Sequence, residues 1–285
     1  MGLPKFLPDR NSRLVRWGGH ALLALALVYC AVAIHSLGAD ALLSALTPTA
    51  WGVTLTSGLV YAAALGLLAF AWGGMSEGER NLSRVEKVAV YAPGVLAKYI
   101  PGSVFQYGSR QLLGARFEMA QKTMAKASLV EAGVHVLAAL LAAAGLLLGG
   151  GSVFLVGLIT VGAGWALVGS DALFRAIGCQ IAFFAVFALL VAWLAGEALG
   201  MHAPFRMAGL FMLAWVAGFL VPVAPGGLGV RESALLALVA GDDFTTSVTV
   251  FAVLTRLSTS VGDAVFGLSG YLALSLARSN RHASG

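Results

Sequence analysis

The chain has 285 residues, of which 59% are hydrophobic and 11% are charged, and its formal net charge is +5 at pH 7. Soluble domains are about 45–50% apolar and about 25% charged, and a soluble protein of this size could not hide so much apolar surface. The composition therefore excludes a soluble enzyme, a nucleic-acid-binding protein and a disordered chain. It predicts an all-α, polytopic membrane helical bundle of about six to eight spans, because each span needs ~20 apolar residues. We expect a single integral membrane domain over residues 1–285.

The N-terminal residues 1–17 form a basic tail that precedes the apolar run Ala21–Leu37. Cations next to the first span favour a cytoplasmic N-terminus. The run Ala31-Val32-Ala33 resembles the cleavage site of a signal peptide. Because the apolar run is longer than a usual signal-peptide core and further spans follow, we predict an uncleaved first span.

A second span is predicted at Trp51–Trp72, and residues 74–126 after it are the least apolar part of the chain. This segment holds more Lys and Arg than Asp and Glu, which places it on the cytoplasmic side. Leu82 and Val85 recur on one helical face, opposite Arg84 and Lys87. The spacing predicts a short amphipathic helix at the membrane interface, followed by a re-entrant stretch.

The remaining apolar runs predict further spans, which we place at Leu129–Leu148, Val153–Val168, Ile177–Leu199, Ala208–Val221, Leu228–Ala240 and Thr245–Leu276. Two of these runs are short and meet at a Pro/Gly-rich break, so residues 222–240 form a broken helix or a re-entrant segment. A hairpin and two full crossings are both compatible with this pattern. Either topology leaves both termini in the cytoplasm of a multi-pass plasma (inner) membrane protein.

The Pro/Gly break occurs twice in the same context. Pro101 and Gly102 are followed by Arg110, and Glu131 lies 30 residues after the proline. Pro225, Gly226 and Gly227 are followed by Arg231 and Glu232, and Arg256 lies 31 residues after that proline. Paired interrupted segments are typical of transporters with a site at the bilayer midplane. The order predicts an internal repeat, although chance similarity in a glycine-rich chain is the alternative.

Charged side chains at membrane depth are costly, so each is a candidate binding residue. We expect Arg110, Arg231 and Arg256 to hold a phosphate group, because a guanidinium binds phosphate through two parallel hydrogen bonds. Amides at the start of the helix after the second break would add donors. Glu131 and Glu232 would balance charge or contact a cationic or hydroxylated part of the ligand.

Purely structural pairings are the alternatives for these charges. Glu131 could pair with His135 one turn away, or with a basic residue on another helix. Arg256 and Asp263 lie seven residues apart on one face and could form an ion pair. Lys98 is expected to extend to the interface.

Two motifs resemble a known family. The segment from Lys98 to Arg110, with Glu131 downstream, resembles the flippase-like transmembrane domain of lysylphosphatidylglycerol synthase and its stand-alone relatives. The segment from Pro225 to Glu232, with Arg256 downstream, is the more specific of the two motifs. The resemblance implies a helical bundle with re-entrant segments that handles lipids. Bifunctional members carry a soluble aminoacyl-transferase domain after the membrane part, and no such domain follows here, so transferase activity is not expected.

Together the motifs predict a flippase-like translocator of a phospholipid or glycolipid with a phosphate-bearing head group, and its partners would be membrane lipids. One alternative is a non-transporting membrane partner of a glycosyltransferase or lipid-modifying enzyme, which would dock on the basic residues 74–126. Another is an integral-membrane transferase. The sequence contains no nucleophile–base motif and no cluster with metal-ligand spacing, so we expect no catalytic residue, metal or cofactor.

Overall fold

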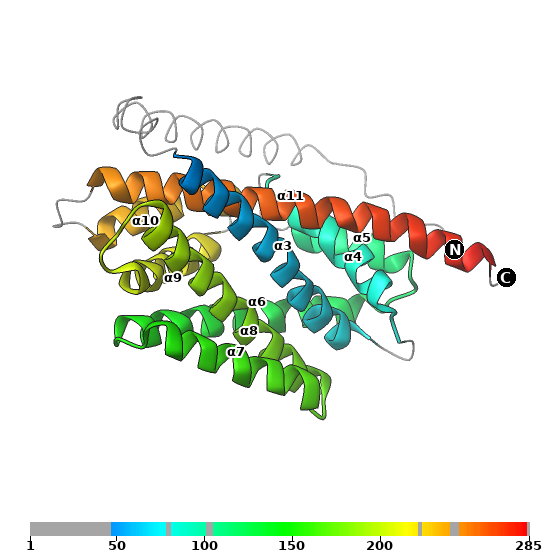
Figure 1. Cartoon of the computed structure of the whole chain (residues 1–285). Coiled ribbons are helices and arrows are strands. Elements are labelled where there is room, and N and C mark those ends of the chain that lie inside the picture. The colour runs from blue at the N-terminus through cyan, green and yellow to red at the C-terminus, as the bar shows by residue number, and fades with distance from the viewer. Residues whose placement is uncertain (1–46, 78–80, 101–104, 222–223, 240–244, 284–285) are drawn as a thin grey trace.

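The computed structural model describes residues 47–77, 81–100, 105–221, 224–239 and 245–283. Within these ranges the chain forms nine α-helices and no strands, which confirms the all-α prediction for this part of the protein (Figure 1). The basic tail, the predicted first span Ala21–Leu37 and the break residues Pro101 and Gly102 lie outside the described residues.

Five helices are long and apolar enough to cross a membrane. They are α3 (Pro48–Ser76), α6 (Gln121–Leu147), α7 (Gly151–Val168), α8 (Ala172–Trp193, extended by the π-helical turn Leu194–Ala198) and α11 (Thr245–Ala283). Each contains or overlaps one of the predicted spans. Two of them begin with a side-chain cap: the Thr47 hydroxyl accepts the Ala50 N–H at 3.1 Å before α3, and Asp171 accepts the Phe174 N–H at 2.8 Å before α8.

Four shorter helices form two packed pairs. The first hairpin consists of α4 (Arg84–Ala97) and α5 (Phe105–Ala115), joined by residues 98–104. The second hairpin consists of α9 (Pro204–Leu220) and α10 (Val230–Val239), joined by residues 221–229. Ten helical residues extend only about 15 Å, half the thickness of the bilayer core. Helix α10, as the structure describes it, is therefore too short to cross that core, and it packs against α9.

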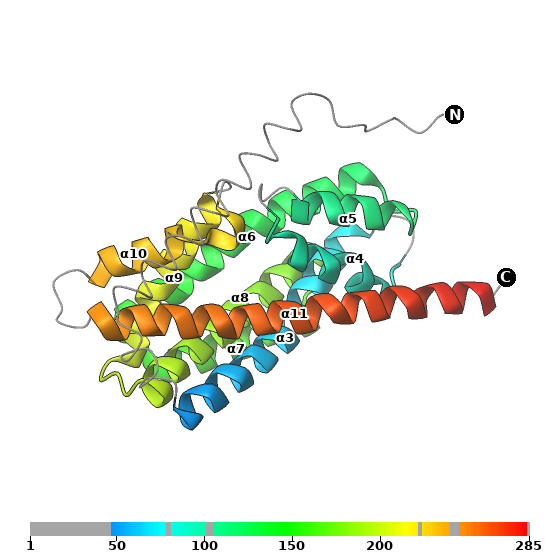
Figure 2. The same cartoon turned by 90° about the horizontal axis from the view of Figure 1, so that it is seen from above.

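The two hairpins enter the bundle from opposite ends. Three long helices, α6, α7 and α8, lie between them in the sequence, and each is long and apolar enough to cross a membrane. Because that number is odd, the chain reaches the second hairpin at the end opposite to the first. Figures 1 and 2 show α4 and α5 toward one end and α9 and α10 toward the other, with α11 beside both pairs.

The first hairpin differs from the amphipathic interfacial helix predicted for its sequence. A capping box starts α4, in which Ser83 and Glu86 bond each other's backbone N–H. The next turns then enter the bundle, and Ala89 and Val90 are fully buried, whereas Val85 is 37% exposed. The prediction was wrong because the first turn alone has a polar face. The rest of α4 packs on α11, where a Cβ at Gly270 would lie 2.6 Å from Pro93.

Small residues allow the long helices to approach closely. A Cβ at Gly262 of α11 would lie 2.6 Å from the Gly58 carbonyl oxygen of α3. A Cβ at Gly162 of α7 would lie 2.7 Å from the Gly178 carbonyl oxygen of α8. Such contacts are typical of helices that associate in lipid, where close packing replaces the hydrophobic effect.

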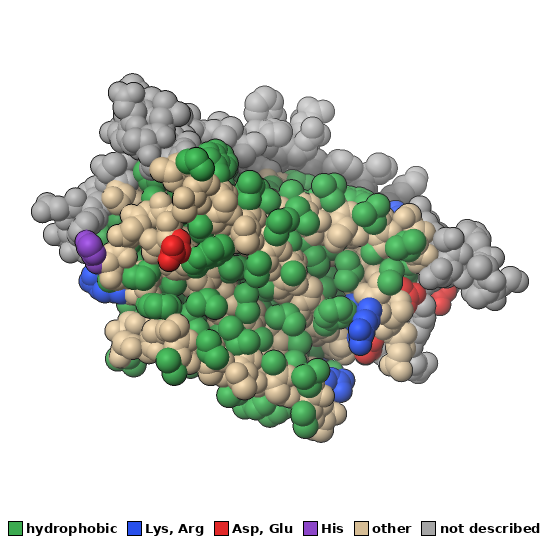
Figure 3. Space-filling model, viewed as in Figure 1, with side chains coloured by type: hydrophobic (Ala, Val, Ile, Leu, Met, Phe, Trp, Pro, Cys, Tyr) green, Lys and Arg blue, Asp and Glu red, His purple; other side chains and the backbone are tan. Residues whose placement is uncertain are grey.

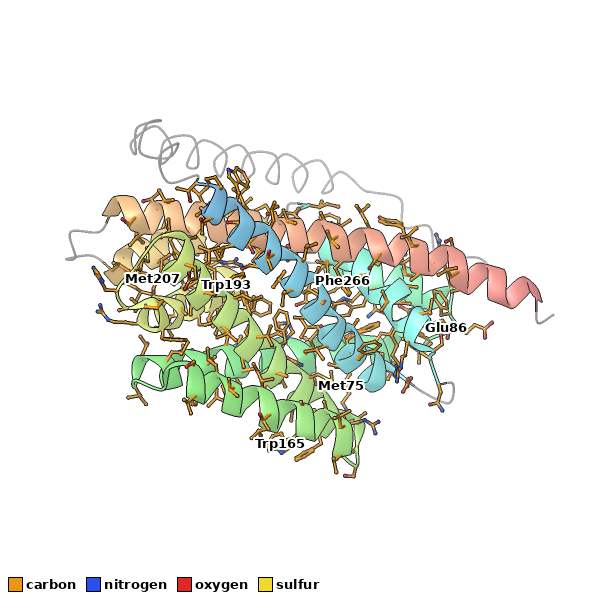
Figure 4. The ribbon with its side chains drawn as sticks, viewed as in Figure 1. Met75, Glu86, Trp165, Trp193, Met207 and Phe266 are labelled. Carbon is orange, nitrogen blue, oxygen red and sulfur yellow. The ribbon has the colours of Figure 1, made fainter. Side chains whose placement is uncertain are left out.

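The outer surface is apolar between the two ends of the bundle. On the face in Figure 3, hydrophobic side chains cover the middle and most charged side chains lie toward the ends. Helix α7 buries only Leu155 and Gly162, and its Trp165 projects outward with 38% exposure (Figure 4). The structure thus supports a membrane-embedded bundle whose apolar side chains face lipid.

Candidate functional site

A cavity of about 340 Å³ lies where the ends of both hairpins meet α3, α6, α8 and α11. Four of the predicted site residues, Arg110, Glu131, Arg231 and Arg256, come from four different helices and line it together. These four charges lie up to 146 positions apart in the sequence. Its remaining charged lining residues are Lys98 and Asp263.

Arg110 and Glu131 form an ion pair in the wall of the cavity. The Arg110 side chain is 4% exposed and that of Glu131 is 3% exposed, and Arg110 Nη1 donates to Glu131 Oε2. The hydroxyl of Tyr91 donates to Glu131 Oε1 at 2.6 Å, and the Arg110 guanidinium lies 3.8 Å from the centre of the Tyr91 ring. This matches the expectation that Glu131 pairs with a basic residue on another helix. His135 instead contacts Gln180, with 2.6 Å between Nδ1 and Oε1.

Arg256 and Glu232 form a second ion pair at the second hairpin. Arg256 Nη2 lies 2.8 Å from Glu232 Oε1, and Arg256 Nη1 donates to the Gly226 carbonyl at 2.8 Å. The other Glu232 oxygen accepts the Gly229 N–H at 2.8 Å. Glu232 does not line this cavity, and its carboxylate holds Arg256 and the start of α10.

A third group of contacts joins the first hairpin to α11. Lys98 Nζ lies 2.7 Å from Asp263 Oδ2, and the Tyr99 hydroxyl donates to the same oxygen at 2.6 Å. The predicted Arg256–Asp263 pair is therefore not formed, because each residue is held by a different hairpin. The interfacial position predicted for Lys98 is also wrong, since a buried carboxylate draws its ammonium inward.

Arg231 lines the cavity and has no carboxylate partner in the described part of the chain. Among the residues that the structure describes, its side chain makes one long hydrogen bond, of 3.4 Å from Nη2 to the Gly226 carbonyl, and its Nε is buried without a partner. The guanidinium carbon lies 5.9 Å and 6.0 Å from the ring centres of Phe211 and Trp215. A half-buried cation with an unused donor is a favourable place for an anion.

The second break adopts a backbone that only glycine accepts easily. Gly226, Gly227 and Gly229 have φ of 57°, 73° and 79°. The N–H groups of Gly227 and Leu228 donate to the carbonyls of Ala224 and Pro225, and that of Gly229 donates to Glu232. These three amides are thus satisfied within the break. They precede α10, whose first residue is Val230.

Two glycines that sequence reasoning missed set the positions of the cavity arginines. A Cβ at Gly94, near the end of α4, would lie 3.3 Å from Arg110 Cγ and 2.9 Å from the Gln106 carbonyl oxygen. A Cβ at Gly218, near the end of α9, would lie 3.2 Å from Arg231 Cβ. The signal in the sequence is a glycine in the last turn before each break, which allows the second helix of each hairpin to pack closely on the first.

The rest of the cavity wall is largely aromatic and aliphatic. These residues come from α3, α8 and α9 and comprise Tyr61, Leu65, Leu68, Phe183, Trp215 and Phe219. One cavity thus combines an uncompensated guanidinium with an apolar wall. Such a lining suits an amphiphile with an anionic group.

No family model, no curated protein and no solved structure matches this chain.

Proposed function

We propose that the protein is a flippase-like translocator of phospholipids or glycolipids that carry a phosphate in the head group. The observation that carries the proposal is Arg231, a cation without a carboxylate partner in a partly apolar cavity. A lipid phosphate is the anion most abundant near such a depth in a membrane. Its oxygens would take the free guanidinium donors while the acyl chains stay in the bilayer.

The arrangement of the hairpins supports translocation. We take both hairpins as re-entrant segments that approach the bilayer midplane from opposite faces, as in transporters built from inverted repeats. Each unit has the same order of a helix, a break, a second helix with an arginine, and a long helix with a charge. The two ion pairs have their charges reversed. In the first unit the hairpin supplies the cation, Arg110, and the long helix supplies the carboxylate, Glu131. In the second unit the hairpin supplies the carboxylate, Glu232, and the long helix supplies the cation, Arg256. An internal repeat accounts for both features.

The distribution of exposed cations supports a cytoplasmic location for the end that holds the first hairpin. Exposed basic residues of this end are Arg84, Arg116, Lys122, Lys126 and Arg175. The opposite end contributes Arg206 among the described residues. By the positive-inside rule, this distribution favours cytoplasmic termini. We propose the plasma membrane as the location. The two motifs that resemble the lysylphosphatidylglycerol synthase family agree with this reading.

Reconstitution in liposomes tests the proposal. Proteoliposomes would contain a trace of a phospholipid labelled with a fluorophore on its acyl chain, and an impermeant reductant would bleach the outer leaflet, with and without a membrane potential. We expect the parent protein to make the inner-leaflet label accessible, Arg231→Gln to lose this activity, and Arg175→Gln to retain it. Arg175 is exposed and lies outside the cavity, so it is the matched control. Bleaching that stops at half of the signal with the parent protein would contradict translocation.

A second candidate is a non-transporting partner of a glycosyltransferase or lipid-modifying enzyme. The observation that favours it is the exposed basic end, where Arg116, Lys122 and Lys126 lie at the start of α6 and just before it. Charge reversal at these three positions would disrupt docking and leave lipid translocation in liposomes unchanged. Arg231→Gln would have the opposite effect, so the two variants separate the candidates.

A further inference from the structure

We infer that the cavity selects a lipid head group that has one net negative charge and carries a hydroxyl group near its phosphate. The inference rests on the proposed function and names the class of lipid that the same site would accept.

The charged side chains of the site do not balance. Its cations are Lys98, Arg110, Arg231 and Arg256, and its carboxylates are Glu131, Glu232 and Asp263. With His135 neutral, the four cations and three carboxylates among the described residues leave one net positive charge. Three ion pairs between these residues account for every one of these charges except that of Arg231. A monoanionic head group neutralises the site, whereas a zwitterion leaves it positive and a dianion makes it negative, and residual charge is costly at membrane depth.

Three side chains that line the cavity have hydrogen-bonding atoms without a partner among the described residues. Arg110 and Arg231 each have a buried Nε without an acceptor. Asp263 is 1% exposed, and its Oδ1 has no donor although Oδ2 accepts two. Phosphate oxygens can only accept, so they satisfy the arginines and leave Asp263 unpaired. A hydroxyl on the head group supplies the missing donor. An ammonium could also donate, but it would cancel the phosphate charge and leave Arg231 uncompensated.

The volume of the cavity limits the size of the group that it can hold. A cavity of about 340 Å³ lies at the small end of the range for ligand pockets, ~300–1,000 Å³. It has room for one polar head group but not for two acyl chains as well. Recognition in the cavity is therefore recognition of the head group, and lipids with identical acyl chains should be distinguished there.

Three synthetic lipids with identical acyl chains test the inference. Phosphatidylglycerol has one negative charge and hydroxyl groups, phosphatidylmethanol has the same charge without a hydroxyl, and phosphatidylethanolamine is a zwitterion. Competition for the purified protein in detergent, measured by native mass spectrometry, gives relative affinities. We expect phosphatidylglycerol to bind about fivefold more tightly than phosphatidylmethanol, since one hydrogen bond contributes ~1 kcal/mol. Phosphatidylmethanol should bind about tenfold more tightly than phosphatidylethanolamine, since the ammonium of the zwitterion leaves the site with a residual positive charge at membrane depth.

Two variants assign the preferences to their residues. Arg231→Gln should abolish the preference for phosphatidylmethanol over phosphatidylethanolamine. Asp263→Asn should keep that preference and lose the advantage of phosphatidylglycerol over phosphatidylmethanol. Arg175→Gln should behave like the parent. If Asp263→Asn does not fold, the comparison of phosphatidylglycerol with phosphatidylmethanol on the parent protein still decides the hydroxyl contact.

The outcomes separate this inference from the proposed function. Equal binding of the three lipids by a parent protein that translocates lipid in liposomes would overturn the head-group selectivity alone. Absence of lipid binding together with absence of translocation would overturn both. Tighter binding of phosphatidylethanolamine than of the two anionic lipids would overturn the charge argument.

Discussion

Within the cavity, one charged side chain differs from the others. Arg110, Arg256 and Lys98 each have a carboxylate partner, so they hold helices together, whereas Arg231 keeps its donors free. Substitutions should therefore fall into two classes. Loss of a paired residue lowers stability by leaving its partner charged and buried, and loss of Arg231 affects function with little effect on the fold.

Replacing Arg231 tests this distinction directly. Arg231→Lys keeps the charge but loses the planar fork, so we expect roughly a tenfold lower translocation rate, and Arg231→Gln should be lower still. Thermal unfolding of both variants in detergent should stay close to that of the parent, because no ion pair is broken. A large fall in the unfolding temperature of Arg231→Gln would instead indicate a structural role.

The two ion pairs should differ in how much they stabilise the fold. Glu131→Ala leaves Arg110 buried and unpaired, which we expect to cost about 3–5 kcal/mol. Arg256→Ala should cost less, because Arg256 and Glu232 are 17% and 15% exposed and water can solvate the remaining carboxylate. Both variants should insert into the membrane and lose translocation. Unfolding midpoints measured by fluorescence-detected gel filtration would rank the variants.

A double variant serves as the control for the buried pair. Glu131→Ala combined with Arg110→Ala removes both charges, so it should be more stable than Glu131→Ala alone. If the double variant were less stable than either single variant, the pair would not be the main source of the effect.

The sequence located most of the site but not its pairings. Four site residues could be predicted because a charged side chain within an apolar run is costly at membrane depth. They are Arg110, Glu131, Arg231 and Arg256. The partners of Glu232 and Asp263 could not be found, since pairing depends on which hairpin end reaches α11. Spacing along one helix suggested a pair between positions 256 and 263, but contacts between helices determine the partners.

At the scale of the elements, the second break depends on the conformation of its glycines. Gly227 and Gly229 both have positive φ, but their surroundings differ. A Cβ at Gly227 would lie 3.2 Å from Gly218, whereas nothing lies within 4 Å of a Cβ at Gly229. The two positions thus form a matched pair for separating backbone strain from close packing.

We expect Gly229→Ala to destabilise the protein by about 1–2 kcal/mol, the cost of a left-handed conformation for an L-residue. Gly227→Ala should cost more, because the added methyl group also separates α9 from the break. Unfolding midpoints give the comparison, and Gly52→Ala, a helical position with open space around it, is the control. Equal effects at the two positions would show that packing against Gly218 contributes nothing.

The elements were predicted unevenly. Long apolar runs identified α3, α6, α7, α8 and α11 because twenty apolar residues have few alternatives to a spanning helix. The hairpin form of the second break could not be distinguished from two crossings, because hydropathy is the same in both. For α4, the amphipathic pattern covered only the first turn, and the residues after it are largely buried, among them Val90, Tyr91 and Val95.

For the whole molecule, the two hairpins enter the bundle from opposite ends, and this arrangement determines which loops lie at the same end. The start of α4 and the start of α6 lie at one end, and the turn between α6 and α7 lies at the other.

The number of spans predicted from the sequence was about six to eight. The described residues contain five candidate spans and two hairpins, and the predicted first span lies outside them.

Cysteine labelling in intact cells tests the proposed orientation. Ser83 precedes α4 and Ser152 starts α7, and both are exposed at opposite ends of the bundle. In a chain whose Cys30 and Cys179 are replaced by serine, an impermeant maleimide should label Ser152→Cys and not Ser83→Cys. Permeabilised cells should label both, which controls for reactivity. The reverse pattern in intact cells would invert the orientation.

The length of α11 has a practical consequence. Its 39 residues extend about 58 Å, nearly twice the ~30 Å bilayer core, and tilts of up to ~40° cannot absorb that difference. In Figures 1 and 2 its last turns project beyond the other helices at the end near α4 and α5. A folded domain joined to it through a continuous helix would keep a fixed orientation outside the detergent belt. Such a fusion would serve as a fiducial marker for cryo-electron microscopy of a 29.3 kDa protein that is otherwise too small to align.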